Sequence, residues 1–160
     1  MMDSMDRAAG LAPEDTVFGA RRFRPEFVKG AELCRASALT PASDLGLSAV
    51  LRVALARRMA ALNEYSALIA EYDAQFSALE PTDELKAVAG GAMDLREPLA
   101  TIVRHVDLVT LTPDRALASD IARLVEAGLD NPQIVALSEL IAFVNFQIRV
   151  ATGLRLLKSA

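Results

Sequence analysis

The stretch that decides the fold is Ser48 to Phe76, SAVLRVALARRMAALNEYSALIAEYDAQF. Its apolar residues recur every three or four positions, which is the spacing that lines one side of an α-helix. The sequence therefore predicts one long amphipathic helix over these residues. Such a helix buries its apolar side against other helices, so the neighbouring segments are expected to be helical as well.

Helix start and stop signals follow on the C-terminal side. Thr82 is a predicted N-cap, and Gly90-Gly91 ends the helix that it begins. Pro98 is tolerated only in the first turn of a helix, and Thr112-Pro113 and Asn131-Pro132 each begin another one. The predicted helices span residues 83–89, 97–111, 113–127 and 132–157. No segment alternates as a strand does, so the predicted fold class is all-α.

The N-terminal part lacks comparable periodicity. Residues 1–22 are polar with scattered Ala and Gly, and they are predicted to form a frayed arm. A short helix is expected after Pro25, within residues 24–39, and the turn formers of residues 40–47, TPASDLGL, form a connector. The predicted organisation is an arm with a short helix over residues 1–44 and one helical domain over residues 45–160.

The composition supports a single domain that assembles with itself. A chain of 160 residues is long enough to bury one core and too short for two ordinary domains. Hydrophobic residues make up 52% of the chain, yet there is no Trp, so the excess consists of the Ala, Leu and Val of close helix packing. A monomer has difficulty covering this much apolar surface, and a symmetric homo-oligomer is the expected solution.

Charge and cysteine usage exclude several classes of function. The 17 Lys and Arg against 21 Asp and Glu leave a net charge of -4, which argues against a nucleic-acid partner. A helix-turn-helix over residues 115–146 is disfavoured because its second helix is apolar on nearly every side. One Cys and one His offer no metal-ligand spacing, and no cofactor motif is present. The single Cys and the absence of an export signal predict a cytoplasmic protein.

Residues 134–150 are the most apolar stretch, but they include Glu139, Asn145, Gln147 and Arg149. The polar residues predict a buried helix and no membrane partner. The same region takes part in an internal repeat. Gly46–Asn63 aligns without gaps to Gly128–Asn145, and seven of the eighteen positions are identical. This alignment predicts two similar helical hairpins.

Two patches carry a resemblance to a known family: LRVALARRMAALNEYSALIAEY at residues 51–72 and EAGLDNPQIVALSELIAFVNFQIRVATGLRLL at residues 126–157. They resemble the carboxymuconolactone decarboxylase and alkylhydroperoxidase D superfamily, in its peroxidase-related branch. The resemblance covers residues 45–157. It implies an alkylhydroperoxidase D-like helical bundle, assembly into trimers or hexamers, and either antioxidant peroxidase or lactone decarboxylase activity.

The chain departs from the family's redox motif. Where relatives carry Cys-x-x-Cys and a His four residues further on, this chain has Tyr65, Leu68 and Tyr72, and the relay Glu is replaced by Val53. Dithiol peroxidase chemistry needs a thiolate nucleophile, a resolving thiol and a base on one side of a helix. All of these groups are replaced, so we expect no dithiol reaction.

Three functions remain open. The first is a non-redox paralogue, or a partner of a relative that keeps Cys-x-x-Cys. The second is a cofactor-free enzyme for a small organic acid, with Tyr65, Tyr72, Arg52 and His105 as catalytic candidates around a helical pocket. The third is a single-Cys peroxidase that uses Cys34.

Each candidate also has a structural interpretation. His105 is expected on a helix surface and Cys34 as a half-buried hydrophobe. Arg52 and Arg149 each interrupt an apolar helix, and a buried Arg needs a carboxylate partner. Glu139 is a candidate, because Arg149 lies ten residues further on near the same side of the helix, and a ligand carboxylate is the functional alternative. Tyr65 and Tyr72 either fill the position of the redox site or line an open pocket there.

Overall fold

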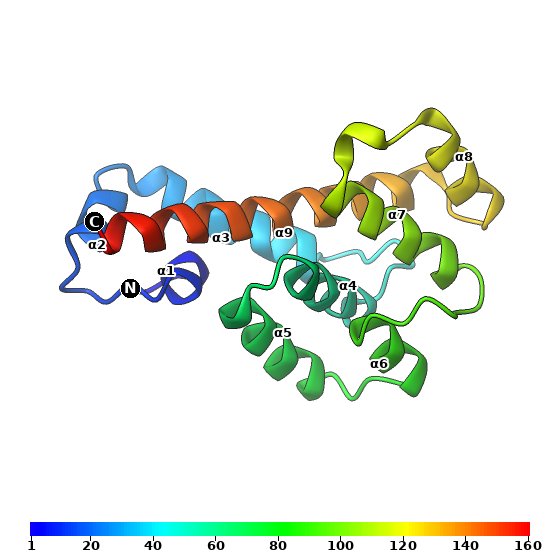
Figure 1. Cartoon of the computed structure of the whole chain (residues 1–160), viewed down its shortest axis with the longest axis horizontal. Helices are drawn as coiled ribbons and strands as arrows, with labels where there is room; N and C mark the ends of the chain where they lie inside the picture. Colours follow the sequence, from blue (N-terminus) through cyan, green and yellow to red (C-terminus); the bar gives the residue numbers. More distant parts are fainter.

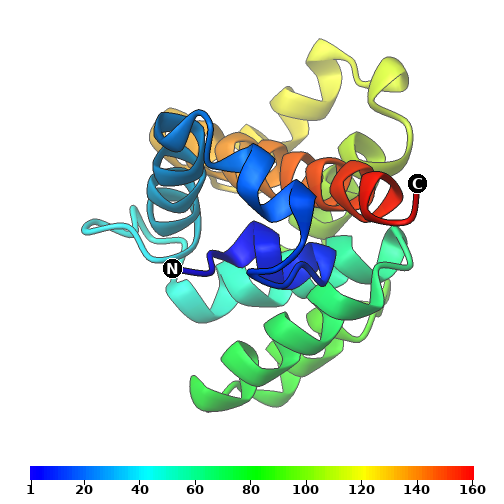
Figure 2. The same cartoon turned by 90° about the vertical axis from the view of Figure 1, so that its left-hand side faces the viewer.

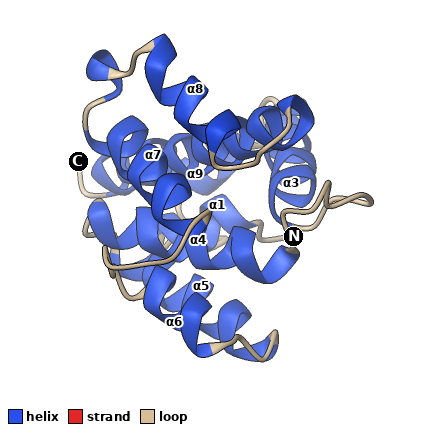
Figure 3. Ribbon diagram, turned by 90° about the vertical axis from the view of Figure 1, so that its right-hand side faces the viewer, coloured by secondary structure: helices blue, strands red, loops and turns tan.

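Helices alone build the protein, and a computed structural model describes residues 1–160 throughout (Figure 3). The all-α prediction is therefore confirmed. In chain order the elements are α1 Ser4–Ala9, α2 Thr16–Arg21, α3 Pro25–Leu39, α4 Ala49–Leu62, α5 Ser66–Ala78, α6 Asp83–Ala89, α7 Leu99–Leu111, the 3₁₀ turn η1 Pro113–Arg115, α8 Ala118–Glu126 and α9 Asn131–Lys158.

The C-terminal helix α9 runs along the length of the molecule, with most of the other helices around it, while α5 and α6 pack on α4 (Figure 1). It contacts α1, α2, α3, α4, α7 and α8. It begins at Asn131, one residue before the predicted start. The Asp130 side chain accepts a hydrogen bond from the Gln133 amide at 2.8 Å, and the Gln133 side-chain oxygen accepts one from the Asp130 amide at 2.9 Å. α9 is long and apolar enough to cross a membrane, but 61% of its most apolar window is buried inside the protein, as in a core helix.

The stretch from Ser48 to Phe76 is not one helix. It folds as α4 and α5, which pack against each other as a hairpin. The Glu64 and Tyr65 amides donate to the carbonyls of Ala61 and Ala60, both at 3.0 Å, which is the double hydrogen bond that closes a helix in a Schellman turn.

The sequence gives no local signal for this turn, because Glu64 occupies the position that glycine usually occupies. Glu64 has a φ of 54°, in the left-handed region. The ends of α1, α6 and α8 form the same turn with a left-handed glycine at this position, namely Gly10, Gly91 and Gly128. The prediction of a single helix was wrong for this reason.

The N-terminal segment is folded, and the predicted frayed arm was wrong as well. α1 packs against α5 and α9, and Met5 is only 1% exposed. Asp3 pairs with Arg21 at 2.9 Å, and Asp6 pairs with both Arg21 and Arg22. These partners are 15 or more residues away in the chain, so local polarity alone suggested an arm. Both chain ends lie at the same end of the molecule (Figure 1), and Figure 2 views that end directly.

Two helix starts also differ from the predictions. α7 begins at Leu99, just after Pro98, two residues later than expected. The segment from Pro113 forms a short 3₁₀ turn, and α8 begins only at Ala118, because Asp120 accepts from the Leu117 amide at 2.8 Å and starts a new helix there. By contrast, α6 has the predicted bounds, with Thr82 accepting from the Leu85 amide.

The two halves of the internal repeat have the same local geometry. Gly46 and Gly128 both have positive φ, at 80° and 99°. Two positions further on, Ser48 and Asp130 are the N-caps of α4 and α9. At the far end, the side-chain amides of Asn63 and Asn145 donate to the carbonyls four residues earlier, at 2.9 and 3.0 Å. The halves differ in that α4 ends at this point whereas α9 continues.

Candidate functional site

The three residues that the sequence resemblance places at a redox motif lie together at the start of α5 and within it. Tyr65 is the N-cap residue just before α5, and spacings of three and four place Leu68 and Tyr72 on the same side. Tyr65 is 5% exposed, while Leu68 and Tyr72 have no exposed surface. We call these three residues the tyrosine face.

Both hydroxyls of the tyrosine face are hydrogen-bonded to other groups of the protein. The Tyr65 hydroxyl donates to the Ala8 carbonyl at 2.8 Å, and the Tyr72 hydroxyl donates to Gln147 Oε1 on α9 at 2.6 Å. Burial raises the pKa of both hydroxyls, so each stays protonated at neutral pH and acts as a hydrogen-bond donor. Val53, at the relay position, is buried on α4.

Arg52 is buried but has no carboxylate partner. Its guanidinium donates to three backbone carbonyls that surround the connector between α3 and α4, those of Leu47 at 2.7 Å, Ala38 at 3.0 Å and Asp44 at 3.0 Å. Burial lowers the pKa of Arg52, and the nearby charges of Asp44 and Glu139 oppose this effect. Arg52 therefore holds the connector in place, and the expectation of an ion pair was wrong.

His105 is not the surface residue that its neighbours suggested. It is only 7% exposed, and its Nδ1 atom is buried without a hydrogen-bond partner. Burial lowers the pKa of the imidazole, with the Asp120 charge opposing, so His105 is neutral at pH 7. A neutral imidazole in this state can accept or donate a proton.

His105 lines a cavity of about 570 Å³ between α7, α9 and the segment that joins α7 to α8. The walls are largely apolar, and α9 contributes residues at helical spacing from Ser138 to Val150. Asn145 is the buried polar residue opposite, and its amide donates to the Ile141 carbonyl at 3.0 Å. The lining is His105, Val109, Pro113, Ala116, Ile121, Ser138, Ile141, Ala142, Asn145, Phe146, Arg149 and Val150.

Cys34 is exposed on α3, contrary to the expected half-buried position. It lines a second cavity, of about 560 Å³, between α3 and α9. Ala142 and Phe146 line both cavities and separate them. Arg35, the residue after Cys34, pairs with Glu71 at 3.1 Å.

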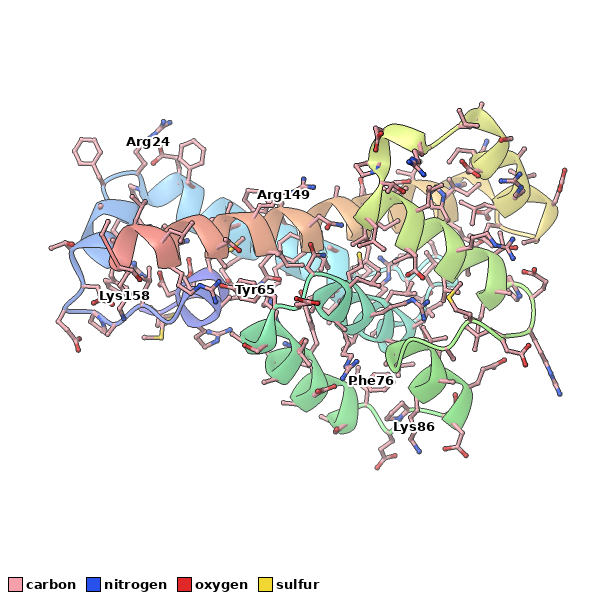
Figure 4. All side chains as sticks on the ribbon, viewed as in Figure 1. Arg24, Tyr65, Phe76, Lys86, Arg149 and Lys158 are labelled. Carbon is pink, nitrogen blue, oxygen red and sulfur yellow. The ribbon has the colours of Figure 1, made fainter.

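The fold does not bring the catalytic candidates together. Tyr65 and Tyr72 share one buried face, but Arg52, His105 and Cys34 lie in separate surroundings. Figure 4 shows Tyr65 and Arg149 on opposite sides of α9. No group of three or more His, Cys, Asp or Glu side chains is arranged to hold a metal ion.

Sequence reasoning missed Asn145 and Gln147 as site residues. Both interrupt an apolar helix, as Arg52 does, and this interruption was the available signal. Their roles depend on partners in α5, α7 and α9 that only the tertiary structure identifies.

Comparisons with known proteins bear on the fold. No family model matches the chain, and no curated protein matches it in sequence. Among solved structures, it is similar to an uncharacterized peroxidase-related protein from Silicibacter sp. TM1040, with a TM-score of 0.71 and 16% identity over 95% of this chain and 79% of that one. The chain thus has the helical fold of a peroxidase-related protein.

Proposed function

We propose that the protein is a non-redox paralogue of peroxidase-related proteins that works by assembling with copies of itself. The observation that carries this proposal is the tyrosine face. At the position where the resemblance places a dithiol, two tyrosine hydroxyls are bonded to protein atoms and Leu68 has no exposed surface. A peroxide would find neither a thiol nor space there.

A peroxidase assay tests the loss of redox chemistry. With an alkyl hydroperoxide and a dithiol reductant, we expect no turnover above the rate without protein, for the wild type and for Cys34→Ser alike. Turnover that disappears in Cys34→Ser would refute the proposal in favour of a single-Cys peroxidase. Turnover that persists in Cys34→Ser would refute it too, because no other thiol is present.

Exposed apolar side chains support the proposed assembly. Phe27 and Leu33 on α3 are each 60% exposed, and Val135 and Phe146 on α9 are 57% and 46% exposed. Leu33 and Phe146 line the second cavity, and exposed apolar side chains of this size are typical of contacts between subunits. Light scattering at micromolar concentration is expected to give a closed oligomer, such as the trimer or hexamer that the resemblance implies. A monomer would contradict the proposal.

A second candidate function is favoured by His105. A buried, neutral and unpartnered imidazole beside a largely apolar cavity suits a cofactor-free enzyme that acts on a small organic acid. This cavity beside His105, and not the expected pocket around Tyr65, Tyr72 and Arg52, is the candidate site for such an enzyme.

The second candidate can be tested by NMR, since His105 is the only histidine and its ring signals need no assignment. Benzoate serves as the probe, and benzamide as its uncharged control. Binding in the cavity shifts the His105 signals, and the benzoate charge raises the pKa of the imidazole whereas benzamide does not. Signals that do not move at saturating benzoate would exclude this site.

A further inference from the structure

The outer side of α9 carries a regular row of exposed residues, and most of the other residues between Ile134 and Ala151 are buried. These residues follow each other at alternating spacings of four and three, which is the repeat by which two helices pack along a shared seam. The row consists of Val135, Glu139, Ala142, Phe146, Arg149 and Gly153. We call it the α9 row. It lies on the side of α9 where Figure 4 shows Arg149, away from Tyr65.

We propose that the α9 row is the contact between two copies of this chain, with the two α9 helices antiparallel about a two-fold axis near Val144. The partner in this contact is a second copy, and the inference rests on the proposed assembly. In an antiparallel pair centred at Val144, each residue faces the residue of the second copy that lies equally far from Val144 in the other direction along α9. The numbers of two facing residues therefore add to 288. The row therefore pairs with itself.

The self-pairing is complementary in charge. Glu139 faces the second copy's Arg149, and Arg149 faces the second copy's Glu139. Both side chains are exposed and neither forms an ion pair within its own chain, although eleven ion pairs exist elsewhere in the protein. The two-fold arrangement supplies the missing partner for both charges at once.

The self-pairing is also complementary in size. The large Phe146 faces the small Ala142 of the second copy, and Val135 faces Gly153. Phe146 and Ala142 sit between the two apolar cavities on either side of α9, so each Phe146 has concave apolar surface to enter. Large residues opposite small ones allow two helices to approach closely.

The contact has a consequence for His105. Ala142, Phe146 and Arg149 belong to the α9 row and also line the cavity that contains His105. A second copy on the α9 row therefore covers the rim of this cavity. The cavity between α7 and α9 is therefore closed off from solvent only when two copies pair, and assembly completes the surroundings of His105.

Charge reversal tests the contact, with mass measured by light scattering and sedimentation across a concentration series. A two-fold contact requires an even number of copies, so the wild type is expected to be a dimer or a hexamer, and a trimer would refute the α9 contact while self-assembly stands. Glu139→Arg and Arg149→Glu each set like charges against each other in both symmetric pairs, and we expect the dissociation constant of the two-fold contact to rise about a hundredfold or more. The double variant, Glu139→Arg with Arg149→Glu, restores opposite charges and is expected to restore the wild-type mass.

The control is Glu126→Arg, which makes the same change at an exposed residue of α8 outside the row and is expected to leave the mass unchanged. All three positions are exposed, and circular dichroism verifies that each of the four variants keeps its helical content. If the wild type assembles but the single reversals do not weaken it, or if the double variant does not recover, the α9 contact is refuted while self-assembly stands. A monomeric wild type refutes both.

Discussion

Replacing Tyr72 by Phe removes one hydroxyl from the most enclosed part of the tyrosine face. That hydroxyl donates to Gln147 Oε1 at 2.6 Å, and neither residue has exposed surface. The Nε2 atom of the same amide is already buried without a partner. Tyr72→Phe therefore leaves the whole Gln147 amide unbonded in the core.

A buried polar group left unpaired costs about 1–3 kcal/mol, and we expect Tyr72→Phe to lower the free energy of unfolding by about 2 kcal/mol. In a domain of this size that corresponds to a fall in Tm of about 4–8 °C. Gln147→Leu leaves the Tyr72 hydroxyl unpaired and is expected to cost a similar amount. The double variant removes both partners, so it should cost about as much as one single change.

Urea unfolding followed by circular dichroism measures these values, at one protein concentration because assembly adds to stability. Tyr65→Phe is the matched comparison, since it loses one hydrogen bond to a backbone carbonyl and is expected to cost about 1 kcal/mol. If Tyr72→Phe stays within about 0.5 kcal/mol of the wild type, or if the costs of the two single changes simply add in the double variant, the hydrogen bond between Tyr72 and Gln147 does not stabilise the tyrosine face.

Three further predictions concern single residues. Arg52→Met is expected to lower the unfolding free energy by about 3 kcal/mol, because three carbonyls lose their donor; an unchanged urea midpoint would contradict this. Glu64→Gly is expected to raise it by about 1 kcal/mol, since glycine adopts the left-handed φ of 54° without strain, and a loss of stability would contradict the Schellman turn. Burial alone would raise the pKa of Asp6, but hydrogen bonds from Arg22 and the Asp3 backbone and the charge of Arg21 lower it overall. The stability that ionised Asp6 contributes is thus present above the carboxyl's ordinary pKa of about 4 and is lost as pH falls below it. Asp6→Asn should have a lower free energy of unfolding than the wild type at pH 7. When that free energy is measured against pH, the variant should lose less of it than the wild type between about pH 4 and 2.

Single residues show how far local sequence determines this fold. Thr82 and Pro25 begin α6 and α3 where the sequence indicates, because an N-cap or an N-terminal proline acts on amides only two or three residues away. α9 begins one residue before its predicted start at Pro132, with Asp130 and not the expected Asn131 as its N-cap. The all-α class follows from the same local periodicity. The absence of a dithiol also needs no structure, since the chain has one Cys.

The tertiary structure decided what depends on residues far apart in the chain. Glu64 ends α4 without a local signal, and the Asp3 and Asp6 carboxylates are buried only because Arg21 and Arg22 reach them. His105 is buried by α9, some forty residues later. Local sequence encodes hydrogen bonds within one helical turn, whereas the burial of a polar side chain depends on which distant helix supplies its partner or its cover. The all-α class and the helices with local start and stop signals could therefore be predicted from the sequence. The folding of α1 and α2, the turn between α4 and α5, and the surroundings of Tyr72, Arg52 and His105 could not.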